Sequence, residues 1–281
     1  MKVEHFALAP AHPLRPYLHS IWKISNAAHG HRERIMPRGV VDLLFPLSGR
    51  VVVADGGGSA PPILTDAPFV VGVQNRAITT VTAGVTTLLG VSLRAEMARA
   101  ILPLPAREIS GAVVEAPLVL GDAGPIFARL GAAISFADQC AILLRWLLDR
   151  VKPDRRIDAV GHACGMLART PTEARMRDAA KSLLVSPRHV RRLLLDHIGM
   201  TPQDYIRLRR FNRALALMAS ARDLTTIAQE SHYYDQAHLC HDFQTIAGMT
   251  PREYRAQSGP VPGLVFSENV RVIQVPPDAM A

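Results

Sequence analysis

Three arginines at the start of one short segment have the type and spacing needed to read DNA. The segment SPRHVRRLLLDHIG has apolar residues at helical spacing that predict one buried face: Val190, Leu193, Leu194 and Ile198. Arg188, Arg191 and Arg192 then project from the opposite side of the first turns. Arginine donates paired hydrogen bonds to guanine in the major groove. The alternative is an ordinary solvated basic face.

A second segment, about fifty residues further along, has the same layout with little charge. Its outward residues are Gln236, Ala237, His238 and His241. Gln236 could pair with adenine, whereas His238 fits a packed or capping role equally well. An interface made of both segments would be asymmetric, and the first segment would supply more of the affinity.

Other residues are expected to hold the DNA backbone. The stretch between the two segments carries basic residues suited to phosphate contacts or to solvation: Arg207, Arg209, Arg210 and Arg213. Ser186 and Asp235, at the expected helix N-caps, are assigned to the backbone as well. The chain has a net charge of +8, and residues 151–256 hold 17 Lys and Arg against 11 Asp and Glu. Positive charge is therefore concentrated where a phosphate-facing surface would need it.

A repeat places the two segments in supersecondary units of one type. One four-residue motif occurs twice at an offset of 49, as Gly199-Met200-Thr201-Pro202 and as Gly248-Met249-Thr250-Pro251. Ala180 pairs with Ala228 at an offset of 48. One turn is therefore a residue longer in the second unit. Each unit predicts a helix, a short turn and a helix: residues 176–183 and then Ser186-Pro187, and residues 224–231 and then Asp235. Thr201-Pro202 begins a connecting helix of about 18 residues. Such pairs place their second helix in the major groove.

These residues resemble the AraC/XylS family of bacterial transcription regulators. The motifs are SPRHVRRLL, GMTPQDYIRLRRFNRAL, IAQ, YYDQAHL and GMTPREYR, within about residues 160–256. The resemblance implies two helix-turn-helix subdomains joined by a long helix, and sequence-specific regulation of transcription. It also implies the base-facing positions Arg188, Arg191, Arg192, Gln236, His238 and His241.

The sequence departs from that family at both turns, where Leu184 and His232 replace the usual glycines. If the backbone has positive φ there, each bulky residue costs about 1 kcal/mol or more.

Residues 1–122 predict a β-rich domain that resembles the sensor domain of an AraC-like subgroup, through LRPYLHSIWKI, MPRGVVDLLF and FVVGVQNRA. That resemblance implies a cupin-like β-barrel that senses a small molecule. The expected strands are Val40–Leu47, Val51–Ala54, Phe69–Val73, Ala77–Thr82 and Thr86–Leu93. The expected fold class is thus α+β, with an N-terminal barrel and flanking helices and an all-α double helix-turn-helix domain.

The remaining boundaries follow from composition. Residues 123–151 predict one or two helices that either form a dimer interface or pack on the β domain. The DNA-binding domain is expected over residues 152–258, starting with a linker at residues 152–156, and residues 259–281 predict an extended tail with one strand near Val270–Val275.

Ligand chemistry in the N-terminal domain is less defined. Arg32, Arg34 and Arg38 could form an edge that binds a phosphorylated or carboxylate ligand, or could simply be solvated. His29, His31 and Glu33 are cupin-like metal ligands by type, but no later histidine within residues 32–161 completes a site, so neither metal nor cofactor is expected. Cys140, Cys164 and Cys240 lack CxxC spacing and fit core positions. An enzyme is therefore not expected.

The expected partners are double-stranded DNA, an unidentified small-molecule effector and a second copy of the chain, with RNA polymerase as a possible partner. A ligand-independent architectural protein with a dimerising N-terminal domain is the alternative. No apolar run is long enough for a membrane span and no signal peptide is apparent, which predicts a cytoplasmic protein.

Overall fold

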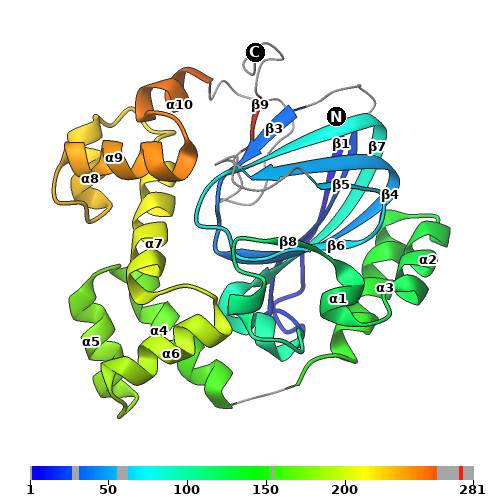
Figure 1. Ribbon diagram of the computed structural model, residues 1–281, viewed down its shortest axis with the longest axis horizontal. Helices are drawn as coiled ribbons and strands as arrows, with labels where there is room; N and C mark the ends of the chain where they lie inside the picture. The colour runs from blue at the N-terminus through cyan, green and yellow to red at the C-terminus, as the bar shows by residue number, and fades with distance from the viewer. Residues whose placement is uncertain (1, 27–31, 56–62, 153–154, 258–271, 275–281) are drawn as a thin grey trace.

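Antiparallel strands form the N-terminal half of the chain in the computed structural model, which describes residues 2–26, 32–55, 63–152, 155–257 and 272–274 (Figure 1). The strands are β1 Lys2–Phe6, β2 Leu18–Asn26, β3 Arg32–Ile35, β4 Val40–Asp55, β5 Ile63–Thr65, β6 Phe69–Val71, β7 Ile78–Arg94, β8 Val113–Glu115 and β9 Val272–Gln274. Their main order is β1-β2-β7-β4-β6-β8, while β3 pairs with β7 and β9, and β5 pairs with β4. The expected α+β class, with an antiparallel sheet domain followed by a helical domain, is confirmed.

The two longest strands, β4 and β7, pair with each other at the centre of the sheet. β4 and β7 pair from Val40 opposite Arg94 to Asp55 opposite Ile78. Sequence reasoning divided each into two strands, which is wrong. The register shifts between Pro46 and Arg50, where Gly49 has a φ of +74°. A bulge of this kind bends a strand without ending it.

Alternate residues of a strand point to opposite faces of the sheet, and here both faces are buried. Leu43 and Phe45 lie in the same core as the helices beyond the sheet, whereas Leu44 faces the curled interior with Trp22 and Phe69.

The predicted segment 123–151 forms two helices, α2 Gly124–Ala132 and α3 Phe136–Leu148. Ser135 caps α3, and the Trp146 ring meets Phe45 edge-on with the ring centroids 6.4 Å apart. Leu130, Leu143 and Leu147 are fully buried in the shared core. The apolar stripe therefore packs on the β domain, although Ile134, between the two helices, is fully exposed. Short helical segments complete this half: η1 Ala95–Ala100, η2 Ala106–Glu108 and α1 Ala116–Leu120.

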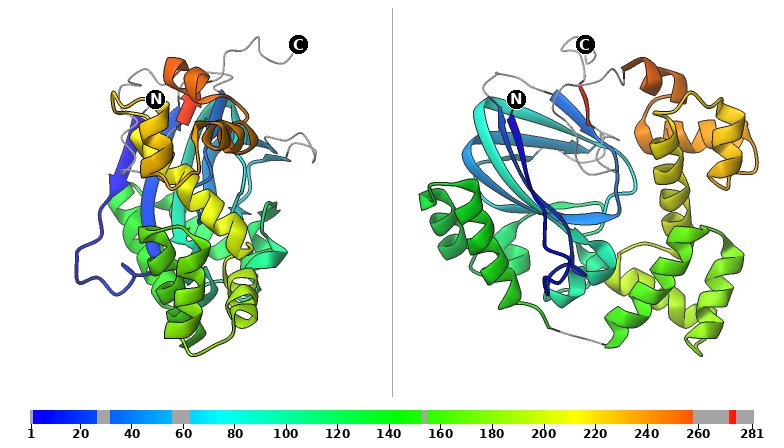
Figure 2. Two further views of the ribbon diagram at one scale, coloured as in Figure 1. Left: turned by 90° about the vertical axis from the view of Figure 1, so that its left-hand side faces the viewer. Right: turned by 180° about the vertical axis from the view of Figure 1, so that it is seen from behind.

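The C-terminal helices lie on the opposite side of the sheet from α2 and α3 (Figures 1 and 2). They are α4 Arg155–Arg169, α5 Glu173–Ser182, α6 Pro187–His197, α7 Pro202–Leu217, α8 Leu224–Glu230, α9 Gln236–Ala247 and α10 Pro251–Gln257. Two helix pairs, α5 with α6 and α8 with α9, stand at either end of α7. No described helix is both long and apolar enough to span a bilayer.

The ends of the predicted DNA-binding domain differ from expectation. Arg155 and Arg156, expected in a linker, begin α4. Within the expected C-terminal tail, β9 lies close to the predicted strand and pairs antiparallel with β3. Residues 153–154 and most of the tail lie outside the described residues.

The repeated Gly-Met-Thr-Pro elements explain how the helical units meet the β domain. Gly199 and Gly248 follow α6 and α9 with φ of +79° and +69°, conformations that suit glycine. Thr201 then caps α7 by accepting a hydrogen bond from the Asp204 amide. Both glycines face the β domain: a Cβ on Gly199 would lie 2.8 Å from the Ala106 carbonyl oxygen, and one on Gly248 would lie 3.5 Å from Arg34 Nη1.

Candidate nucleic-acid interface

Helix α6 presents the predicted arginines on its exposed side. Ser186 Oγ accepts a hydrogen bond from the His189 amide at 3.2 Å, and Pro187 occupies the first turn, as predicted from their types. Val190, Leu193 and Leu194 are buried. Arg188 and Arg191 are exposed and make no hydrogen bond or ion pair with the described residues, while Arg192 lies 3.2 Å from His189 Nδ1. Their charges are thus available to a partner.

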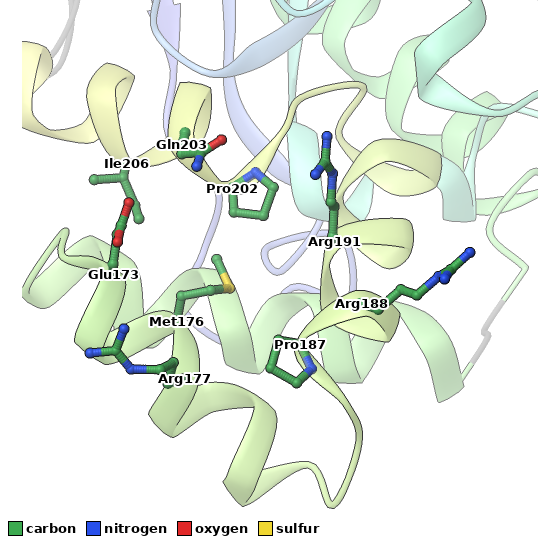
Figure 3. A pocket seen from close by; sticks show the side chains of 9 residues that line it. All are labelled: Glu173, Met176, Arg177, Pro187, Arg188, Arg191, Pro202, Gln203 and Ile206. Atoms are coloured by element: carbon green, nitrogen blue, oxygen red, sulfur yellow. The ribbon is translucent and has the colours of Figure 1, made fainter.

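An open groove of about 660 Å³ runs beside these arginines, between α5, α6 and the start of α7 (Figure 3). Its lining includes Arg188 and Arg191, together with Arg177 of α5 and Gln203 of α7. Glu173 is the one acidic residue of that lining. Sequence reasoning missed Arg177 and Gln203, because only the packing of α5 against α6 and α7 brings them to the groove. A groove with three arginines against one carboxylate suits a polyanion.

Helix α9 is the corresponding surface of the second unit. Gln236 is exposed, and its Oε1 accepts a hydrogen bond from Thr225 Oγ1 of α8 at 3.1 Å. His241 is exposed. His238 packs edge-on against Tyr233 and lies 3.9 Å from the Asp242 carboxylate, so its packed role is the one seen. This surface is polar and nearly uncharged, as predicted.

Three of the four arginines of α7 are hydrogen-bonded within the protein. Arg207 Nε donates to Asp242 Oδ1 of α9 at 2.7 Å. Arg210 donates to the Pro171 carbonyl at 3.0 Å and Arg213 to the Arg169 carbonyl at 3.4 Å, which joins α7 to the end of α4. Arg209 lies at a cavity shared with the β domain. In the structure these residues hold helices and domains together, and their predicted phosphate contacts stay a prediction.

The two predicted cap residues differ in what they can offer to DNA. Asp235 Oδ1 accepts from the His238 amide at 2.7 Å. An ionised carboxylate only accepts hydrogen bonds, so Asp235 acts here as the cap of α9, and its assignment to the DNA backbone stays a prediction. Ser186 keeps its hydroxyl hydrogen and can still donate to a phosphate.

Both turns have the strained backbone foreseen from the missing glycines. Leu184 has a φ of 55° and His232 a φ of 64°, and they are the only non-glycine residues with positive φ among those described. After each, an amide returns to an alanine carbonyl: Val185 N to Ala180 O at 3.0 Å, and Tyr233 N to Ala228 O at 2.9 Å. The extra residue of the second turn is the exposed Tyr234, which precedes the cap Asp235.

Two of the predicted ligand arginines of the N-terminal domain, Arg34 and Arg38, lie at different sites. Arg34 Nη1 donates to the Ala247 carbonyl at 3.2 Å and the Gly248 carbonyl at 3.4 Å, at the end of α9. Arg38 is buried beside Asp42. The side chain of Arg32 lies outside the described set, as do His29 and His31 of the HxHxE cluster. Among described residues, no three side chains of His, Cys, Asp or Glu gather as metal ligands.

Two of the cysteines are core residues. Cys140 and Cys164 are buried, and burial raises the pKa of the Cys140 thiol to about 12 and that of Cys164 further still. Cys240 is half-buried. Thiols that stay protonated are poor nucleophiles.

Two family models match separate parts of the chain. Residues 179–257 match a helix-turn-helix domain family, and residues 7–115 match a domain of unknown function, DUF6597. No curated protein matches the chain. Among solved structures, ToxT from Vibrio cholerae shares 12% identity at a TM-score of 0.48, covering 83% of this chain and 98% of ToxT. A Chromobacterium violaceum regulator described as AraC-type shares 26% identity at a TM-score of 0.32, covering 36% of this chain and 90% of its own.

Two helix-turn-helix units, the first with arginines on its outward side, form the arrangement that DNA-binding proteins use to read the major groove. The family match over residues 179–257 is to a helix-turn-helix domain, which covers the end of α5 and the helices from α6 to α10.

Proposed function

We propose that this regulator reads two DNA elements, one with α6 and one with α9, under the control of a small molecule that acts through the N-terminal domain. The observation that carries the proposal is the presence of two capped helices, each exposing polar side chains at its N-terminal turns. Arg188, Arg191 and Arg192 would read one element, and Gln236 and His241 the other. Arg177 and Ser186 would hold phosphates beside α6.

Control by the N-terminal domain is supported by how closely both units are attached to it. The first unit shares a continuous core with the β domain, in which Leu194 and Ile198 lie with Ala98 and Ile109. Arg107 of η2 also forms an ion pair with Asp196 of α6.

The second unit is held separately. Met36 and Ala77 of the β domain enter its core, and the Ala77 amide donates to the Ile246 carbonyl at 2.7 Å. A change in the β domain would therefore reach both units through packed contacts.

The proposal includes a homodimer, contact with RNA polymerase and a cytoplasmic location. A second copy would present four recognition helices to one DNA molecule. The exposed residues Leu118 of α1 and Ile134, between α2 and α3, leave apolar surface for such a partner.

The test is selection of bound sequences from random duplex DNA by the full chain, combined with a salt titration. Because the first unit shares its core with the β domain, the full chain is the appropriate protein. Enrichment of two elements about one helical turn apart supports the proposal. Salt-sensitive binding without enrichment would instead identify an architectural DNA-binding protein.

A further inference from the structure

A cavity of about 370 Å³ lies where α7 meets the β domain, and the DNA-reading surfaces do not include it. One wall comes from the β domain, with His19 of β2, Arg38, and Arg94 at the end of β7. The other wall comes from α7, with Arg209, Asn212 and Arg213. Its volume is within the range of small-molecule sites. By contrast, the apolar space inside the curled sheet measures only about 80 Å³.

The charge of this cavity is strongly unbalanced. Four arginines line it against one carboxylate, that of Glu96. Arg38 is also paired with Asp42, which lies outside the lining, so an excess of two positive charges remains. Such a concentration of like charge is unfavourable unless an anion compensates it.

Three buried nitrogen atoms of the residues that line this cavity have no partner among the described residues. These atoms are Arg38 Nη1, Arg209 Nε and His19 Nε2. The Arg38 side chain is only 6% exposed, so water compensates its free donor poorly. Buried polar atoms without partners are uncommon in folded proteins and point to a missing ligand or ordered water.

The Arg38 guanidinium is also held in one orientation. Its Nη2 donates to both oxygens of Asp42, at 2.9 and 3.1 Å. Asp42 in turn accepts from Ser92 Oγ, and Ser92 Oγ accepts from Trp22 Nε1 at 3.2 Å. Fixed donors of this kind bind an anion without a further loss of side-chain freedom.

The pKa of His19 reflects the same concentration of positive charge. Burial first, and then the charges of Arg38 and Arg94, lower the pKa of His19 to about 4, while Asp42 opposes them and Arg209 adds to them. His19 is therefore neutral at pH 7 and can donate a hydrogen bond from one ring nitrogen.

We propose that this cavity binds a compact dianion, a dicarboxylate or a phosphate monoester, that bridges Arg38 and Arg94 of the β domain to Arg209 of α7. The excess of two positive charges sets the charge of the ligand, and arginine forks match carboxylate and phosphate oxygens. The lining contains little apolar surface beyond Val40, Ala168 and Ala216, which suits a small polar molecule. Duplex DNA is too wide for a cavity of this volume with walls from two domains.

Such a ligand would act directly on the DNA-binding half, because α7 joins the two helix-turn-helix units. The inference thus deepens the proposed control by a small molecule and rests on it. If the dianion stabilises one arrangement of α7 against the sheet, it changes the affinity of the protein for DNA by some factor. Bound DNA then changes the affinity of the protein for the dianion by the same factor.

The test is titration calorimetry of the full chain with inorganic phosphate and with succinate, against chloride at matched ionic strength. We expect saturable binding of one dianion per chain. Arg94→Gln and Arg209→Gln should each weaken it about tenfold or more, because each removes a charge-assisted hydrogen bond. Arg129→Gln, on the exposed side of α2, removes the same charge away from the cavity and should leave binding unchanged. Circular dichroism verifies that each variant is folded.

Absence of saturable binding by both probes up to about 10 mM overturns the proposal, and so does equal binding by the wild type and both cavity variants. A further contrary result is that the two variants weaken binding to every DNA duplex alike and leave binding of the dianion unchanged. The arginines would then contact the DNA backbone. Enrichment of specific sequences by the unliganded chain tests the proposed function separately, so the failure of one idea is distinguishable from the failure of the other.

Discussion

Replacement of Leu184 by glycine should stabilise the protein, although it deletes a large apolar side chain. Leu184 has a φ of 55° in the turn between α5 and α6, a conformation that costs an L-residue about 1–2 kcal/mol. The side chain is 94% exposed, so its removal gives up almost no buried area. Glycine loses about 0.4–1 kcal/mol through the greater freedom of the unfolded chain. The net expectation is a gain of about 0.5–1 kcal/mol.

Urea unfolding of the full chain, followed by circular dichroism, measures this gain as a rise in midpoint. Leu184→Ala removes the same exposed surface but keeps the strained backbone, so it should be nearly neutral. Leu118→Gly, at another exposed leucine but within helix α1, should lose about 1 kcal/mol. If Leu184→Gly proves no more stable than Leu184→Ala, backbone strain does not control the stability of this turn and the reasoning is refuted.

Three further results are expected. Gly199→Ala should lower the unfolding midpoint markedly, since its Cβ would lie 2.8 Å from the Ala106 carbonyl oxygen at a φ of +79°; an unchanged midpoint would show that the contact is not maintained. Because the folded pKa of His19 lies near 4, below the value of 6.5 in the unfolded chain, stability should fall as pH drops from 6.5 towards 4, by on the order of 3 kcal/mol. His19→Gln should flatten that dependence in pH-resolved urea unfolding, and equal slopes would contradict it. Iodoacetamide at pH 8 should label Cys240 alone in the native protein and all three thiols after unfolding, as mass spectrometry can show.

Local chemistry made the DNA-reading helices predictable. Ser186 and Asp235 are caps whose side chains bond an amide three residues ahead, and such short-range rules can be read from sequence. The positive φ at Leu184 and His232 was likewise predictable, because a turn of this shape sets the backbone angle regardless of the residue that occupies it.

The partners of the α7 arginines were not predictable, because they come from far along the chain. Arg207 pairs with Asp242, and Arg210 reaches the carbonyl of Pro171. Along a single helix these side chains cannot be distinguished from phosphate-binding ones. The anion cavity has the same origin, since Arg38, Arg94 and Arg209 meet only through the docking of two domains.

The sheet was partly predictable for a related reason. A strand made only of buried apolar residues, such as β6, is evident from composition. By contrast, β1 is half-exposed and β2 mixes polar with apolar residues, so neither stands out. The division of β4 into two strands failed because the turn signal at Gly49 marks a bulge.

The most direct test of two-unit reading is selection of bound duplexes by the full chain and by two variants. Arg191→Ala should lose base preference within one element, at a cost of about 1–3 kcal/mol, and Gln236→Ala should lose it within the other. The two affected positions should lie about one helical turn apart. If both variants altered the same position, or if neither altered the selected sequence, α6 and α9 would not read separate elements and the central claim would be wrong.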